Sequence, residues 1–287
     1  MKRETTRKLL LNVLSGILII CGVIYAGIII GGYRLGQKEY NDLAKKYTSS
    51  YPLSAKDDAP AESTEKGGSM PAEPKIATET GSNSKDNSAA ESTLPADAPP
   101  MIHVDFDRLL KENKDVIAWI SIPAIDISYP VLQADDNEYY LHRDLDGHYL
   151  FAGSIFADCN CSSSFDDYNT ILYGHNMRDG SMFAGLRKFQ DEGTLQKCKY
   201  FLVYTPQAKL LYEIYSVHTA AIGSDTYRIR FNNYEEHGEW LQEMKELSRP
   251  EIDTETTNVE KIVTLSTCTE NTSIRMAIQG NLIWMEY

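Results

Sequence analysis

The sequence lacks the motifs of several large enzyme classes. It contains no P-loop, no dinucleotide-binding glycine pattern, no HExxH helix and no Gly-x-Ser-x-Gly nucleophile turn, and it has no internal repeat. Basic residues are also in the minority, because 28 Lys and Arg residues face 41 Asp and Glu residues, which gives a net charge of -13. A phosphate backbone would be repelled by such a surface, so the charge argues against a nucleic-acid partner.

Cysteine is scarce and odd in number, unlike the dense, even pattern of a disulfide-stapled secreted domain. The five cysteines are Cys21, Cys159, Cys161, Cys198 and Cys268. Cys159 and Cys161 form a Cys-x-Cys pair, but no second pair stands at zinc-finger spacing, so we expect loop thiols and no bound metal. The sequence leaves open whether Cys198 forms a disulfide with one of them.

Charge is absent from residues 9–30, which read LLLNVLSGILIICGVIYAGIII. At about 1.5 Å per residue, a helix of this length crosses a hydrocarbon core of roughly 30 Å. A secretory signal peptide is the alternative, but its apolar core is typically about 7–15 residues long and is followed by a cleavage site. We therefore predict a cytoplasmic tail at 1–8 and a membrane anchor at 9–31. Basic residues are denser before the run than after it, which favours a cytoplasmic N-terminus with the rest of the chain outside.

Three further segments follow the predicted anchor. Residues 32–48 form a juxtamembrane segment, with a short helix expected at 34–48. Residues 49–100 are dominated by Ser, Ala, Glu, Thr, Pro and Lys, a composition that cannot offset its ordering entropy by burying apolar surface. We interpret them as a disordered stalk that holds a globular head, residues 101–287, away from the bilayer.

Within residues 101–287, short apolar runs alternate with turn residues. Helices are expected at 105–118, 181–188 and 234–247. Strands are expected at 119–122, 129–132, 153–157, 169–173, 199–205, 209–219, 261–267 and 273–283. Many short strands with few long helices indicate a closed β-barrel with added helices.

One predicted strand ends on a cysteine, in KIVTLSTC (261–268), and the turn TENT follows it. Strand ends are where reactive groups become accessible, although a buried structural thiol is the alternative. If TENT is a four-residue loop, Ser273 lies opposite Cys268 and Arg275 lies opposite Ser266. Cys268 and Arg275 are then diagonal neighbours on one face, about 7–8 Å apart. An arginine there either favours the thiolate or donates to an oxyanion, unless it is an ordinary exposed strand residue.

A nucleophilic cysteine usually works with a histidine. His175 is the best candidate, because it follows an apolar strand and Gly174 in the sequence NTILYGHN. His142 and His148 are its rivals, since both lie in the polar segment YLHRDLDGHYL.

These features together resemble a known family. TLSTC at a strand end, YGHN upstream and an arginine seven residues after the cysteine resemble the sortases, the cell-surface cysteine transpeptidases of Gram-positive bacteria. The stretches WISIPAIDISYPVLQADDNEYYLHRDLDG, AGSIFAD and YGHNMRDGSMFAGLRKF are most similar to class B. The resemblance implies an eight-stranded sortase β-barrel with added helices, preceded by one transmembrane helix.

The resemblance also implies the site. Cys268 matches the nucleophile, His175 the family histidine and Arg275 the family arginine. Ser266 matches a serine that class B enzymes place beside the site, and we expect Thr267 and Asn176 to line it too. No metal or organic cofactor is required, and the Cys-x-Cys loop is no part of the family pattern.

The implied reaction is cleavage of a C-terminal sorting motif, of the Asn-Pro-x-Thr-x type, after its threonine. A thioester acyl-enzyme then transfers the surface protein to an amine on a peptidoglycan precursor, lipid II. Three alternatives remain at this stage: a pilin-polymerising sortase, a cysteine hydrolase, and a non-enzymatic, surface-displayed binding barrel.

Overall fold

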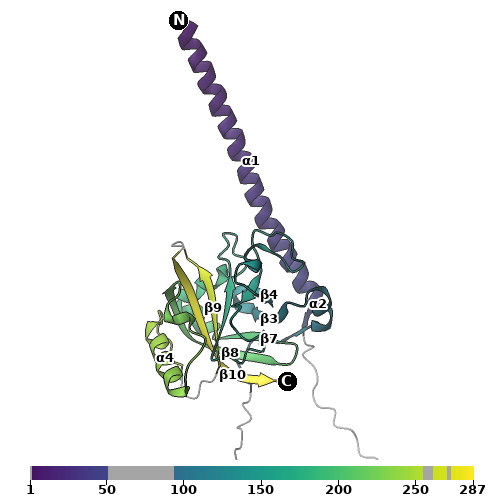
Figure 1. Cartoon of the computed structure of the whole chain (residues 1–287), viewed down its shortest axis with the longest axis vertical. Helices are drawn as coiled ribbons and strands as arrows, with labels where there is room; N and C mark the ends of the chain where they lie inside the picture. The colour runs from purple at the N-terminus through teal and green to yellow at the C-terminus, as the bar shows by residue number, and fades with distance from the viewer. Residues whose placement is uncertain (1, 51–93, 255–260, 270–272) are drawn as a thin grey trace, which may run out of the picture.

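Eight strands form a closed barrel in the computed structural model, which describes residues 2–50, 94–254, 261–269 and 273–287 (Figure 1). Around the barrel the strand order is β10-β8-β7-β3-β4-β5-β6-β9. Neighbouring strands are antiparallel except for β4 with β5 and β6 with β9, which are parallel. The predicted barrel with added helices is therefore confirmed.

The barrel strands are β3 (Val116–Ile122), β4 (Ile127–Leu132), β5 (Ile155–Ala157), β6 (Asn169–Gly174), β7 (Tyr200–Tyr204), β8 (Lys209–Ala221), β9 (Ile262–Cys268) and β10 (Ile274–Glu286). The α-helices are α1 (Lys2–Tyr47), α2 (Phe106–Glu112), α3 (Glu192–Lys197) and α4 (Tyr234–Leu247). Short 3-10 helices span Pro123–Ile125, Tyr139–His142, Ala184–Gln190 and Asp225–Tyr227.

Side chains alternate between two faces along β9 and β10, so the core lies on one face of these strands and the candidate site on the other. Val263 and Leu265 of β9 and Ile278 of β10 are buried in the main hydrophobic cluster. Because side chains alternate between the two faces of a strand, Cys268 and Arg275 lie on the opposite face from these three residues. The chemistry therefore lies on the outer wall of the barrel, backed by a packed interior.

The helices predicted within residues 101–287 are confirmed in one case and corrected in two. Residues 234–247 form α4, which packs against β8. The helix expected at 105–118 ends at Glu112, because Asn113 takes an extended conformation and a buried strand begins at Val116. The helix expected at 181–188 is instead a 3-10 helix at Ala184–Gln190.

α1 is one continuous helix through the predicted anchor and juxtamembrane segment. By length and composition it is long and apolar enough to cross a membrane, with a mean hydropathy of 2.4 in its most apolar window. Figure 1 shows its N-terminal part projecting away from the barrel and its C-terminal end lying against β4 and α2. Tyr40 and Tyr47 near that end are only 3% and 2% exposed.

The predicted stalk lies mostly outside the described residues, at 51–93. Its two flanks are described, and they pair with each other: β1 (Thr48–Ser50) runs antiparallel to β2 (Ile102–Val104). Within the described residues, α1 itself connects the apolar run to the surface of the barrel.

Candidate active site

Cys268 and Arg275 are directly opposite each other in the β9–β10 ladder. The predicted register, with Arg275 opposite Ser266, is wrong by two residues, because β10 begins at Ile274 and Arg275 is the residue that pairs with Cys268. Thr269 holds the connection between β9 and β10 through its backbone N–H and its hydroxyl, which both donate to the Ile274 carbonyl. A shift of two preserves the face, so Arg275 moves from a diagonal position to one about 4.5–5.5 Å away between Cβ atoms.

A cavity of about 340 Å³ brings the three main predicted residues together, since Cys268, His175 and Arg275 all line it. Ser266 and Thr267 line it as well. Its remaining wall includes Asn137, Leu141, Tyr173, Ile222 and Tyr227. The wall is largely apolar and aromatic around a few polar groups, as is usual for a ligand-binding pocket.

His175 follows β6 directly, and the strand can approach its neighbours there because residue 174 is glycine. A Cβ at Gly174 would lie 2.4 Å from Ile155 Cδ1 and 2.7 Å from Phe183 Cγ. The His175 Nε2 atom lies 2.7 Å from the Leu141 carbonyl oxygen. A carbonyl only accepts, so Nε2 carries the proton and Nδ1 is the nitrogen left for proton exchange.

The electrostatic surroundings of His175 oppose its charged form. Burial lowers the pKa of His175 below its usual value, the Leu141 carbonyl opposes that effect, and His142 and Arg275 lower the pKa further. The His142 ring stacks on His175 at a centroid distance of 5.3 Å. The imidazolium is therefore a minority species at neutral pH.

The other predicted residues occupy distinct positions. Asn176 holds the main chain of the cysteine, because its Nδ2 donates to the Cys268 carbonyl over 2.7 Å. His142 is a neighbour of His175 rather than a lining residue of the cavity. His148 lies on an exposed turn and faces Asp144 at 3.9 Å.

Tyr227 was missed by the sequence reasoning, and no local signal in its segment marks it. Its hydroxyl lies 3.0 Å from Ser266 Oγ, which closes one side of the cavity. Burial raises the pKa of Tyr227, so the hydroxyl stays protonated and remains a hydrogen-bond donor.

A buried amide holds the segment that carries Tyr227. Asn169 is fully buried in β6, and its Nδ2 donates to the carbonyl oxygens of Thr226 and Arg228 at 3.2 and 2.9 Å. The Thr264 hydroxyl donates to Asn169 Oδ1 over 2.7 Å and accepts from Gln279 Nε2 over 3.1 Å. These bonds connect three neighbouring strands to the outer wall of the cavity.

All five cysteines are free thiols. Burial raises the pKa of Cys161 to about 12 and that of Cys198 to about 11, so neither forms a reactive thiolate near neutral pH. Cys268 and Cys159 are both partly exposed. Of these two, only Cys268 lies in a cavity with a histidine and an arginine.

Comparisons with known proteins agree with this geometry. A family model described as the sortase domain matches residues 120–283. Sortase B of Listeria monocytogenes is 37% identical over 178 residues, which cover 61% of this chain and 72% of that protein. Sortase B of Staphylococcus aureus is 30% identical over 185 residues, which cover 63% of this chain and 76% of that protein.

Solved structures lead to the same family. Sortase B from Bacillus anthracis, in complex with AAEK1, has a TM-score of 0.58 at 34% identity and covers 63% of this chain and 84% of its own. The Staphylococcus aureus sortase B–substrate complex has a TM-score of 0.59 at 30% identity, with 62% and 83% covered. The chain belongs to the sortase family, most like class B, and is a cysteine transpeptidase of the kind that processes sorting signals.

Proposed function

We propose that the protein cleaves a C-terminal sorting motif of the Asn-Pro-x-Thr-x type after threonine and transfers the protein to an amine of a cell-wall precursor, lipid II. In this proposal Cys268 is the nucleophile, His175 the general acid and base, and Arg275 the oxyanion donor. The observation that carries the proposal is that these three side chains line one cavity.

The first half-reaction forms a thioester. The Cys268 thiolate attacks the threonine carbonyl carbon, and the developing oxyanion accepts hydrogen bonds from the Arg275 guanidinium beside it. The carbon–nitrogen bond then breaks as His175 donates its proton to the leaving amine. The donated proton is the one on Nδ1 of the imidazolium form. Because burial lowers the pKa of His175, only a small fraction of the enzyme carries this proton at neutral pH, which is compatible with slow turnover.

The second half-reaction regenerates the enzyme. An amine attacks the thioester carbonyl, neutral His175 accepts the proton of that amine, and the carbon–sulfur bond breaks to release the Cys268 thiolate. Each step moves one proton and one acyl group, so no metal or redox cofactor enters the scheme.

The location of the protein follows from α1 under the same proposal. We place the N-terminus in the cytoplasm, α1 across the membrane and the barrel on the outer surface, where sorting signals and lipid-linked amines are both present. The denser basic residues before the apolar run support this orientation.

The test uses the full chain in detergent micelles with quenched fluorescent peptides that carry Asn-Pro-x-Thr or Leu-Pro-x-Thr. Cleavage is measured with and without a glycine or diaminopimelate-like amine. Cys268→Ala should abolish cleavage, whereas Cys159→Ala, which removes the other partly exposed barrel thiol, should leave it intact. An amide product in the presence of amine supports transfer. Free acid as the sole product despite amine would favour a hydrolase, and cleavage that survives Cys268→Ala would refute the assignment of the nucleophile.

A further inference from the structure

The C-terminal part of α1 docks on the barrel through one face. Gly36, Tyr40, Leu43 and Tyr47 recur at spacings of four, three and four residues, which places them on one side of a helix. A Cβ at Gly36 would lie 3.2 Å from the Ala152 Cβ, so the helix approaches the segment before β5 closely. The Tyr40 ring packs edge-on against Tyr129, with 5.2 Å between centroids.

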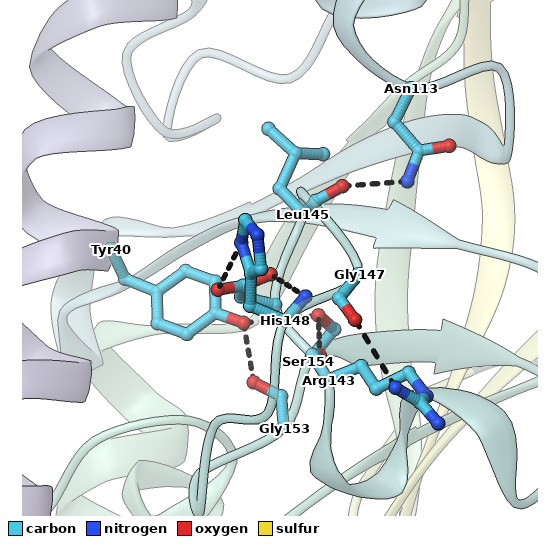
Figure 2. Close-up of polar contacts among 9 residues, drawn as sticks. Tyr40, Asn113, Arg143, Leu145, Gly147, His148, Gly153 and Ser154 are labelled. Atoms are coloured by element: carbon cyan, nitrogen blue, oxygen red, sulfur yellow. Dashed lines mark hydrogen bonds and ion pairs between the residues drawn. The ribbon is translucent and has the colours of Figure 1, made fainter.

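The Tyr40 hydroxyl is hydrogen-bonded to that segment. It donates to the Gly153 carbonyl and lies 3.0 Å from Ser154 Oγ, and Figure 2 shows the ring projecting from α1 toward both residues. The Ser154 hydroxyl in turn donates to the Arg143 carbonyl over 2.7 Å. The Tyr40 hydroxyl therefore contacts the chain at Gly153 and Ser154, and Ser154 connects this segment to Arg143.

Gly153 lies directly against the carbonyl that binds His175. Its φ is +56°, and a Cβ there would lie 2.1 Å from the Leu141 carbonyl oxygen, so only glycine fits. The Ser154 N–H donates to the Tyr140 carbonyl over 3.0 Å, which fixes the two segments side by side. The Leu141 carbonyl then accepts from His175 Nε2 at 2.7 Å.

We propose that Tyr40 is a positioning residue for His175, acting through Gly153, Ser154 and the Leu141 carbonyl. By holding these backbone segments in place, α1 fixes the Leu141 carbonyl, which accepts the hydrogen bond from His175 Nε2. The Nδ1 atom of His175 is thereby directed toward the reacting groups. The proposal rests on the acid–base role given to His175 under the proposed function. Its physical basis is that proton transfer depends steeply on placement, with an error of about 1 Å costing on the order of a hundredfold in rate.

Tyr40→Phe is the informative change, because it removes the hydroxyl and keeps the ring that packs on Tyr129. Tyr47→Phe is the matched control: Tyr47 is an equally buried tyrosine on the same helix, but its hydroxyl donates to Glu112, away from the site. Each variant is made in the full chain in detergent micelles and assayed for peptide cleavage. We expect Tyr40→Phe to lower kcat by about tenfold and to change KM much less, since Leu141 is only one of the residues that line the cavity. Tyr47→Phe should leave both constants unchanged.

A second readout needs no turnover. The His175 resonance in a ¹³Cε1-histidine spectrum, assigned with a His175→Ala protein, is titrated in both variants. Burial lowers the pKa of His175, and His142 and Arg275 lower it further, whereas the Leu141 carbonyl raises it. Weakening that bond should therefore lower the pKa in Tyr40→Phe alone. Equal effects in both variants, or none in Tyr40→Phe, would overturn the proposal. A wild-type chain that cleaves no peptide would count against the proposed function, and the titration would still decide the role of Tyr40.

Discussion

Asn169→Ala should both destabilise the barrel and alter the shape of the cavity. The change removes three hydrogen bonds at a fully buried position, two of them to the carbonyls of Thr226 and Arg228 and one from the Thr264 hydroxyl. Each buried group left without a partner costs about 1–3 kcal/mol. Taking about 1 kcal/mol for each of the three gives a loss of about 3 kcal/mol in the free energy of unfolding.

That loss corresponds to a drop of roughly 6–12 °C in Tm for a domain of this size, measurable by calorimetry. The same change frees the segment that carries Tyr227, so KM for the peptide should rise several-fold. Asn281→Ala is the control, because Asn281 is also buried but its Oδ1 has no hydrogen-bond partner within the described residues. If Asn169→Ala lowers Tm no more than Asn281→Ala and leaves KM unchanged, the network neither stabilises the barrel nor shapes the cavity.

Three further outcomes are expected. Burial lowers the pKa of His218 to about 4, so the stability that neutral His218 contributes is present above about pH 6.5 and is lost as pH falls toward 4. At pH 5 the loss is roughly 2 kcal/mol of the free energy of unfolding. His218→Gln should therefore flatten this part of a curve of Tm against pH. Gly174→Ala should lower the free energy of unfolding by about 1–3 kcal/mol through overpacking and should also lower kcat, with partial rescue by Phe183→Leu. An unchanged Tm in calorimetry would contradict the close approach of residue 174 to Ile155 and Phe183. Iodoacetamide at pH 7 should alkylate Cys268 and spare Cys161 until the protein unfolds, as followed by peptide mass spectrometry, and equal rates would show that burial does not protect Cys161.

The strand faces were predictable because they follow from a period of two. Val263 and Leu265 alternate with Ser266 and Cys268 in the sequence, and the same alternation places Arg275 on the cysteine face. The register was not predictable to the residue, because it depends on the length of an irregular connection. An error of two residues left the face correct, whereas an error of one would have reversed it.

The partners of His175 were beyond the sequence. Leu141 contributes a main-chain carbonyl, which every residue possesses, so no side-chain pattern marks that position. The helix expected at 105–118 failed for a related reason: its apolar spacing continued past Asn113, but the barrel requires Val116 as the first residue of a buried strand. Tertiary packing overrode local periodicity there.

Two sets of contacts position the proposed chemical groups. The hydrogen-bond ladder between β9 and β10 sets the distance between Cys268 and Arg275, and it depends on the barrel alone. His175 follows β6, which pairs with β9, and its Nε2 is held in addition by the stacked turns before β5, which contact α1 through Tyr40. Perturbing α1 should therefore impair proton transfer while leaving the thiol and its arginine in register, so iodoacetamide reactivity of Cys268 should persist when kcat falls. Loss of both together would mean that the barrel and the helix form a single cooperative unit, and that the two sets of contacts are not separable.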